Sequence, residues 1–96
     1  MRLIAFFEDG PGMMEHRKKY EHAHIAYLSE HQSEIPIAGG LRPEPDGTFV
    51  GGLWVLDVES FERAEALIHN DPYYAPELRT YRLLVWGKAL DVEVVL

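Results

Sequence analysis

Apolar residues along the first third of the chain change from a continuous run to a helical spacing. The run Leu3 to Phe7 ends at Glu8-Asp9-Gly10-Pro11-Gly12, which predicts a buried strand followed by a loop. No Pro or Gly interrupts residues 13–32. Within that stretch one helix face is marked by the spacing of Tyr20, Ala23, His24, Tyr27 and Leu28. We therefore expect a strand and then a helix over about 13–32.

The middle of the chain predicts two strands joined by a turn. Residues 35–41 form a short apolar segment with Pro36 near its start and Gly39-Gly40 near its end, where glycines permit other groups to approach closely. The segment 42–47 has the Pro and Asp-Gly composition of a tight hairpin, in which the glycine tolerates a positive φ. Residues 49–58 follow as the next strand.

The last part of the chain predicts a helix and a strand. Ser60 is a candidate N-cap for a helix over 61–70, which should end before Pro72. Residues 79–86 then alternate in the manner of a strand. The order β-α-β-β-α-β predicts a ferredoxin-like α+β fold, in which an antiparallel sheet has two helices on one face. We expect a single domain over residues 1–96.

Two features of the pattern predict a second copy of the chain. The strands carry apolar residues at both parities, for example Leu53 and Val55 against Trp54 and Leu56, although helices cover only one face of such a sheet. The tail 89–96 has the alternation of an unpaired strand. We expect a homodimer or higher oligomer in which two sheets pack into a barrel and the tail pairs with the partner. The alternative is a monomer with a frayed tail and an exposed apolar patch.

Composition narrows the classes of partner. The 96 residues carry a net charge of −7, and the densest basic cluster is Arg17-Lys18-Lys19, so we expect no nucleic-acid partner. Cysteine is absent, which excludes disulfides and thiol chemistry. The first apolar run turns acidic at Glu8-Asp9, too early for a signal peptide, and no run is long enough to span a membrane. We expect a cytoplasmic protein without a membrane partner.

Five histidines suggest a metal site, but their spacing argues against it. His22 and His24 lie about 200° apart around a helix, and no pair has the i, i+4 spacing of a helical chelate. His16 and His24 share a face but are separated by two turns, roughly 12 Å. We expect no metal, and solvated positions for His16, His22 and His31.

His24 differs from the others because it lies within the apolar stripe. A buried imidazole requires a hydrogen-bond partner, and Asp71, where the second helix ends before Pro72, is a candidate. If the two side chains meet, the carboxylate orients the ring as an acid or base in a half-buried cleft. If they do not, His24 is a satisfied core histidine and Asp71 accepts from the backbone N–H groups of Tyr73 or Tyr74. The residues alone leave both interpretations open.

In the order and intervals of its motifs, the chain resembles the YciI-like family of the dimeric α/β-barrel superfamily over roughly residues 3–88. The motifs are His24-Ile25-Ala26-Tyr27-Leu28, Ala38-Gly39-Gly40-Leu41, the Asp46-Gly47 hairpin, Ser60, Asp71-Pro72-Tyr73 and Val85-Trp86. In that family a helix-one histidine and the aspartate of the Asp-Pro element line a proposed active site, which the resemblance assigns to His24 and Asp71. One departure is Glu21, where members often carry an arginine, and this argues against an anion-binding role for that position.

The resemblance implies a lyase or isomerase of the dehydrochlorinase or muconolactone-isomerase type, acting on a small organic acid without a cofactor. His24 would be the acid/base, Asp71 its orienting group, and the N–H groups near Gly39 and Gly40 oxyanion donors. Candidate pocket walls are Tyr27, Tyr73 and Trp86. The alternative is a non-catalytic small-molecule-binding or accessory module, and a weaker one is a haem-dependent monooxygenase with His24 as axial ligand.

Overall fold

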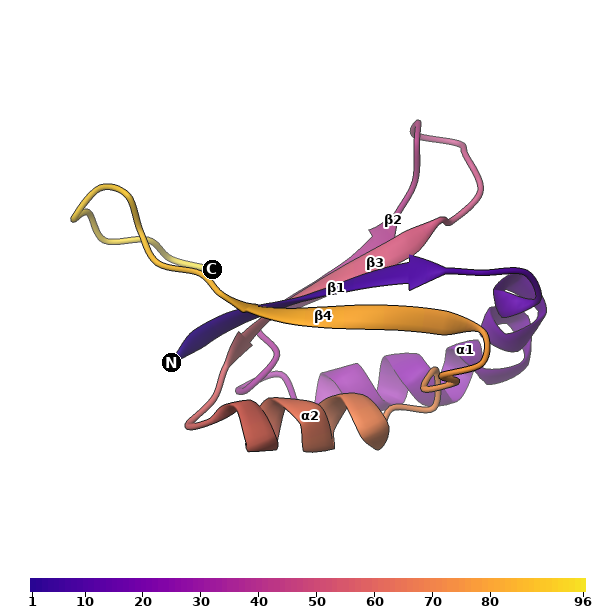
Figure 1. Cartoon of the computed structure of the whole chain (residues 1–96), viewed down its shortest axis with the longest axis horizontal. Coiled ribbons are helices and arrows are strands. Elements are labelled where there is room, and N and C mark those ends of the chain that lie inside the picture. The colour runs from indigo at the N-terminus through magenta and orange to yellow at the C-terminus, as the bar shows by residue number, and fades with distance from the viewer.

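The computed structural model describes residues 1–96 and contains four strands and two helices in the predicted order (Figure 1). The elements are β1 (Arg2–Asp9), α1 (Met13–Glu30), β2 (Ile37–Leu41), β3 (Gly51–Asp57), α2 (Phe61–His69) and β4 (Arg79–Val85). The strands form one antiparallel sheet in the order β2-β3-β1-β4, and both helices lie on the same face of it. This arrangement confirms the predicted ferredoxin-like α+β fold.

The hydrophobic core lies between the sheet and the two helices. Alternate residues of β1 point into it, and Leu3 and Ala5 are completely buried. The remaining core side chains come from β3, α2 and the segments next to β2 and β3. The core consists of Leu3, Ala5, Phe7, Ile35, Trp54, Leu56, Val58, Ala64, Leu67 and Ile68. Burial of this apolar layer is the main stabilising term of the fold.

Local sequence signals set the helix ends. Gly12 precedes α1 with a φ of 91°, a left-handed conformation that glycine adopts without steric cost. Ser60 adopts an extended conformation before α2, and its Oγ accepts a hydrogen bond from the backbone N–H of Arg63. Helix α2 ends at His69, shortly before Pro72, as predicted.

The connection between β2 and β3 differs from the predicted tight hairpin. It extends from residue 42 to residue 50, and Gly47 does not have a positive φ. The Glu44 carbonyl instead accepts a hydrogen bond from the Gly47 N–H within a local turn. The expected strand start at Phe49 is therefore wrong by two residues, because Phe49 leaves the ladder and places its ring against Gly40.

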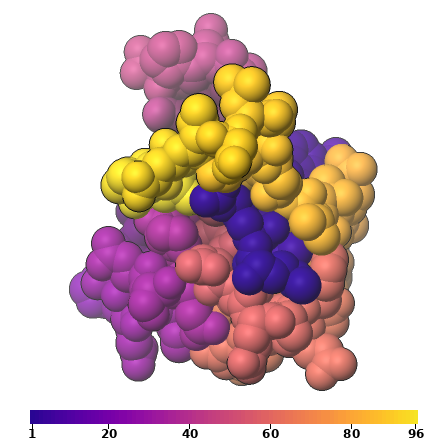
Figure 2. All heavy atoms as spheres, turned by 90° about the vertical axis from the view of Figure 1, so that its left-hand side faces the viewer, coloured from indigo at the N-terminus to yellow at the C-terminus, as the bar shows by residue number.

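The outer face of the sheet carries no helix. Ile4 pairs with Val55 and Leu84, and Val55 also pairs with Ile37, so an apolar row crosses all four strands. Ile37 and Leu84 are exposed. The segment after β4 forms no strand in the single chain, and both views place it on the side of the sheet opposite the helices (Figures 1 and 2). Neither helix combines the length and apolar character needed to cross a membrane.

Candidate active site

The structure brings His24 and Asp71 together from two distant parts of the chain. His24 lies on the sheet-facing side of α1, and Asp71 follows the end of α2. His24 Nδ1 is 2.6 Å from Asp71 Oδ1, and both residues are buried. Because an ionised carboxylate only accepts, the Nδ1–H donates and Nε2 is the ring nitrogen available to a ligand.

The Asp-Pro-Tyr segment fixes both sides of this contact. Asp71 Oδ1 also accepts from the backbone N–H of Tyr73, at 3.2 Å, so the carboxylate holds its own turn as well as the imidazole. The Tyr73 ring stacks on the His24 ring at 3.6 Å between centroids and an interplanar angle of 7°. The same carboxylate therefore makes both of the contacts that the sequence offered as alternatives. His24 is held by a hydrogen bond at one edge and by an aromatic ring on one face.

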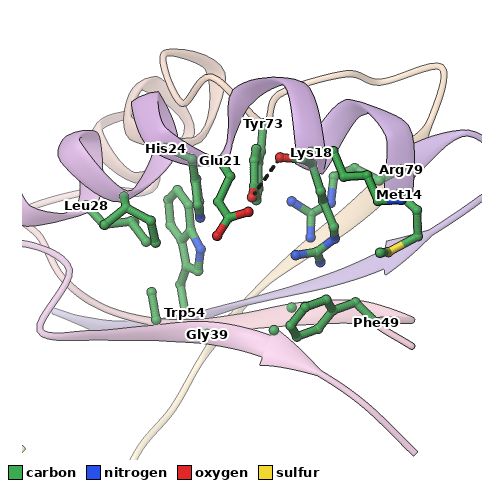
Figure 3. Close-up of a pocket in the computed structure, with 15 residues that line it drawn as sticks. Met14, Lys18, Glu21, His24, Leu28, Gly39, Phe49, Trp54, Tyr73 and Arg79 are labelled. Atoms are coloured by element: carbon green, nitrogen blue, oxygen red, sulfur yellow. Dashed lines mark hydrogen bonds between the residues drawn. The ribbon is translucent and has the colours of Figure 1, made fainter. Parts of the chain in front are cut away.

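His24 lines a cavity of about 350 Å³ between α1 and the strands β2 and β3, a volume at the lower end of the range for small-molecule sites. The cavity is lined by Met14, Arg17, Lys18, Glu21, His24, Ile25, Leu28, Ala38, Gly39, Gly40, Phe49, Gly52, Trp54, Tyr73 and Arg79. Figure 3 shows Leu28, Trp54 and His24 toward one end, and Lys18, Arg79, Met14 and Phe49 toward the other. Asp71 is not part of the lining, so it contacts His24 on the side of the ring away from the cavity.

Two arginines and one aspartate form a buried ion network below the cavity. Asp9 Oδ2 accepts from Arg17 Nε at 3.0 Å, and the Arg17 Nη2–H donates to the Gly51 carbonyl at 2.8 Å. Arg79 Nε forms an ion pair with Asp9 Oδ1 at 3.0 Å, and neither atom has a hydrogen-bond partner. Asp9 thus supplies the negative charge shared by two buried guanidinium groups.

Burial alters the ionisation of groups around the cavity. Removal from water lowers the pKa of the Arg79 guanidinium, while the nearby Asp9 carboxylate opposes that change. Burial also raises the pKa of the Tyr73 hydroxyl above its ordinary value, which keeps this ring neutral. The Tyr73 hydroxyl lies 3.4 Å from the Arg17 carbonyl, to which it donates. A neutral Tyr73 therefore lies between His24 and the arginines.

The residues selected from the sequence separate into two groups. Gly39, Gly40 and Tyr73 line the cavity together with His24. Tyr27 lies outside it, because its hydroxyl donates to the Leu67 carbonyl at 2.6 Å and so ties α1 to α2. Trp86 also lies outside it, beyond the end of β4, where it is half-exposed and borders two other hollows next to the C-terminal segment.

Several lining residues were not selected from the sequence. Trp54, rather than Trp86, is the tryptophan that lines the cavity. The strand that carries it has apolar residues at both parities, so the alternation did not single it out. Arg79 shares the inward parity of Tyr81 and Leu83 on β4. A charged residue at a core position was therefore the sequence signal that could have selected it. Arg17 lies two helical turns before His24 and is buried. For Phe49 there was no signal, because its position depends on the long loop.

The remaining histidines do not assemble a metal centre. No group of three His, Cys, Asp or Glu side chains is arranged to hold an ion. His22 is exposed, whereas His16 is half-buried, with Nε2–H donating to the Pro72 carbonyl at 3.1 Å. His31 is half-buried against Tyr27. The expectation that His16 and His31 are solvated is therefore wrong, because the Asp-Pro segment and Tyr27 cover them.

Comparison with known proteins places the chain in a family. The YCII-related domain model matches residues 1–87, so the chain belongs to the YCII-related family. The fold is similar to that of 5-chloro-2-hydroxyhydroquinone dehydrochlorinase (TftG) from Burkholderia phenoliruptrix AC1100, solved in complex with 2,5-dihydroxybenzoquinone. That similarity has a TM-score of 0.78 and 24% identity, and covers 91% of this chain and 94% of the other. No curated protein sequence matches the chain.

Proposed function

We propose that this protein is an acid/base enzyme of the lyase or isomerase type that moves a proton at a carbon next to a carbonyl in a small organic molecule. The observation that carries the proposal is the 2.6 Å contact between His24 Nδ1 and Asp71 Oδ1 at the wall of the cavity. A base positioned in this way contributes about 10²- to 10⁴-fold to such a reaction. Membership in a family with a dehydrochlorinase of the same fold supports the reaction class.

In the proposed reaction His24 is the catalytic residue and Asp71 is a positioning residue. Asp71 accepts from Nδ1–H, so the lone pair of neutral His24 is on Nε2. Nε2 takes the proton from the substrate carbon, and the electron pair of the broken C–H bond moves toward the carbonyl oxygen. In an isomerisation the proton returns at another carbon. In a dehydrochlorination the electron pair forms a carbon–carbon double bond as chloride leaves.

The edge strand β2 supports a role for Gly39 and Gly40 in holding the carbonyl oxygen. In an antiparallel edge strand, neighbouring residues alternate between bonding the next strand and pointing away from it. One of these two adjacent N–H groups therefore has no strand partner. Both residues line the cavity, and neither φ lies in the left-handed region. Such an N–H is a candidate donor to a developing oxyanion.

Proton exchange into deuterated water tests the reaction class even while the natural substrate is unidentified. We would incubate the protein with 5-chloro-2-hydroxyhydroquinone and muconolactone and follow carbon-bound deuterium by NMR and chloride release. The native protein should catalyse exchange or release with at least one compound, and His24→Ala should lower the rate by about 10²-fold or more. Asp71→Asn should lower kcat more than it raises KM, because it disturbs ring orientation. His22→Ala, an exposed residue of the same helix, is the matched control.

A His24→Ala variant that reacts at the native rate would overturn the proposal, as would an absence of exchange with every compound. The second candidate is a non-catalytic binding module. It is favoured by the small exposed fraction of His24, 8%, which limits access to the ring. That candidate predicts ligand binding by the native protein without exchange, and a change in affinity alone when His24 is replaced.

A further inference from the structure

The charge of the cavity wall is opposite to that of the whole molecule. The chain has a net charge of −7. The charged side chains that line the cavity are nevertheless mostly cationic, with Arg17, Lys18 and Arg79 against Glu21. The carboxylates of Asp9 and Asp71 lie behind this lining and are held by Arg17 and His24. An acidic protein with a cationic pocket attracts a small anion to that pocket.

Arg79 is the cation with the least satisfied donors. Its side chain is 6% exposed, and its Nε, which faces Asp9, has no hydrogen-bond partner. Its terminal nitrogens also form no hydrogen bond, whereas Arg17 donates to both Asp9 and Gly51. A buried guanidinium is costly unless its N–H groups find acceptors, and a carboxylate in the cavity would supply two of them. Arg79 therefore combines an ion pair with Asp9 and terminal nitrogens that have no protein partner at the cavity wall.

The missing side chain of Gly52 brings Arg79 to the cavity floor. A Cβ atom on Gly52 would lie 3.1 Å from Arg79 Nη2, so the guanidinium occupies the space above this glycine. Gly52 and Arg79 both line the cavity. Arg79 Cζ lies 4.3 Å from the centroid of the Phe7 ring, a cation–π contact that helps to hold the guanidinium in place. The free donors are therefore presented by a rigid group.

We propose that Arg79 binds the carboxylate of the substrate, which makes the substrate class a small carboxylic acid with its reacting carbon next to His24. This inference deepens the proposed function and rests on it. A planar guanidinium pairs with a carboxylate through two parallel hydrogen bonds. Arg17, which shares Asp9 with Arg79, lies seven residues before His24 on α1, about 10 Å along the helix axis. Arg79 and His24 line the same cavity, so a small ligand bound there lies near both. Family members often have an arginine at the position of Glu21 on α1. In this chain Arg79 on β4 would bind the anion instead.

The test compares two probes of equal size, benzoate and its neutral counterpart benzamide, by isothermal titration calorimetry. The native protein should bind benzoate about tenfold or more tightly than benzamide, since charged hydrogen bonds are lost with the amide. Arg79→Gln should abolish this preference, and Arg79→Lys should remove most of it while keeping a charge beside Asp9. Arg82→Gln, an exposed arginine of the same strand, should keep the preference. Equal binding of the two probes, or a preference that survives Arg79→Gln, would overturn the proposal.

A crystal structure of the native protein with benzoate tests the same point if the variants fail to fold. The carboxylate should lie within hydrogen-bond distance of Arg79, and a carboxylate held by Lys18 or by His24 instead would contradict the assignment. Measuring both probe binding and proton exchange, in the native protein and in His24→Asn, distinguishes this inference from the proposed function. An Arg79-dependent preference without any proton exchange would support the carboxylate site and reject acid/base catalysis. His24-dependent exchange with equal binding of the two probes would do the reverse.

Discussion

The buried carboxylate of Asp71 holds two different parts of the site in place. It follows α2, accepts from the Tyr73 N–H in its own turn and accepts from His24 across the space between the helices. Removal of either partner would leave a buried polar group with fewer hydrogen bonds, which costs about 1–3 kcal/mol. The stacking of Tyr73 on His24 further restricts the ring. These contacts fix the imidazole before any ligand arrives.

Tyr27 gives a pH-dependent prediction at the same scale. Burial, assisted by the Asp71 carboxylate, raises the pKa of its hydroxyl to about 12 from 10.0. The folded state therefore holds this proton more tightly than the unfolded chain. This contribution to stability is complete below pH 10 and is lost as the pH rises toward 12. Urea denaturation at pH 7, 10 and 11 should show a steeper alkaline loss for the native protein than for Tyr27→Phe.

The same variant should lose about 1 kcal/mol at pH 7, because the hydrogen bond to the Leu67 carbonyl is removed. Tyr20→Phe, which removes a hydroxyl from the same helix, serves as the matched control. Identical pH dependence of Tyr27→Phe and the native protein would show that Tyr27 does not contribute this proton linkage.

At the scale of elements, the close pairing of β1 and β3 brings the ion network and the cavity together. Glu8 pairs with Gly51 and Phe7 pairs with Gly52. The carbonyl of Gly51 accepts from Arg17, and Gly52 leaves space for Arg79. Two adjacent glycines at the start of β3 thus allow α1, β1 and β4 to contribute charged groups to one site. Side chains at these positions would push the elements apart.

Substitution of Gly51 tests this requirement. A Cβ atom there would lie 2.1 Å from the Phe7 carbonyl oxygen, and backbone atoms cannot yield as a flexible side chain does. Gly51→Ala should destabilise the protein by about 2 kcal/mol, which lowers Tm by roughly 8–16 °C for a domain of this size. Gly39→Ala is the matched control, since nothing lies within 4 Å of its Cβ position, and its Tm should be nearly unchanged. Equal Tm values for the two variants in thermal scans would contradict this account.

The whole molecule leaves the ends of one apolar row exposed, because Ile37 and Leu84 are open to solvent while Val55 is buried. The outer row of Ile37, Val55, Ile4 and Leu84 crosses the sheet on the face opposite the helices, and the alternating tail lies on that same side without pairing (Figures 1 and 2). A row of this kind on a small domain is a typical interaction surface. Packing of two such faces would bury the row on both copies.

We therefore expect a homodimer formed through the outer sheet face. Light scattering should give twice the 11.0 kDa of the chain. Leu84→Glu should shift the protein toward the monomer, because it buries an unpaired charge in the interface. Ala26→Glu adds the same charge to an exposed position of α1 and should leave the mass unchanged. A native protein that is monomeric at high concentration would reject this surface as the interface.

The sequence by itself determined the number, type and order of the elements, because apolar periodicity, Ser60 and the Pro72 stop are local signals that tertiary contacts did not override. It also selected His24 as the one histidine inside an apolar stripe. The contact of His24 with Asp71, the displacement of Tyr27 and Trp86 from the cavity, and the inward turn of Phe49 depend on how helices and loops pack across long sequence separations. Periodicity assigns a residue to a face but not to its neighbour on another element. Arg79 shows the difference most clearly. The alternation along β4 assigned it to the inward face, but only the fold placed its Nη2 over Gly52 and its Nε beside Asp9.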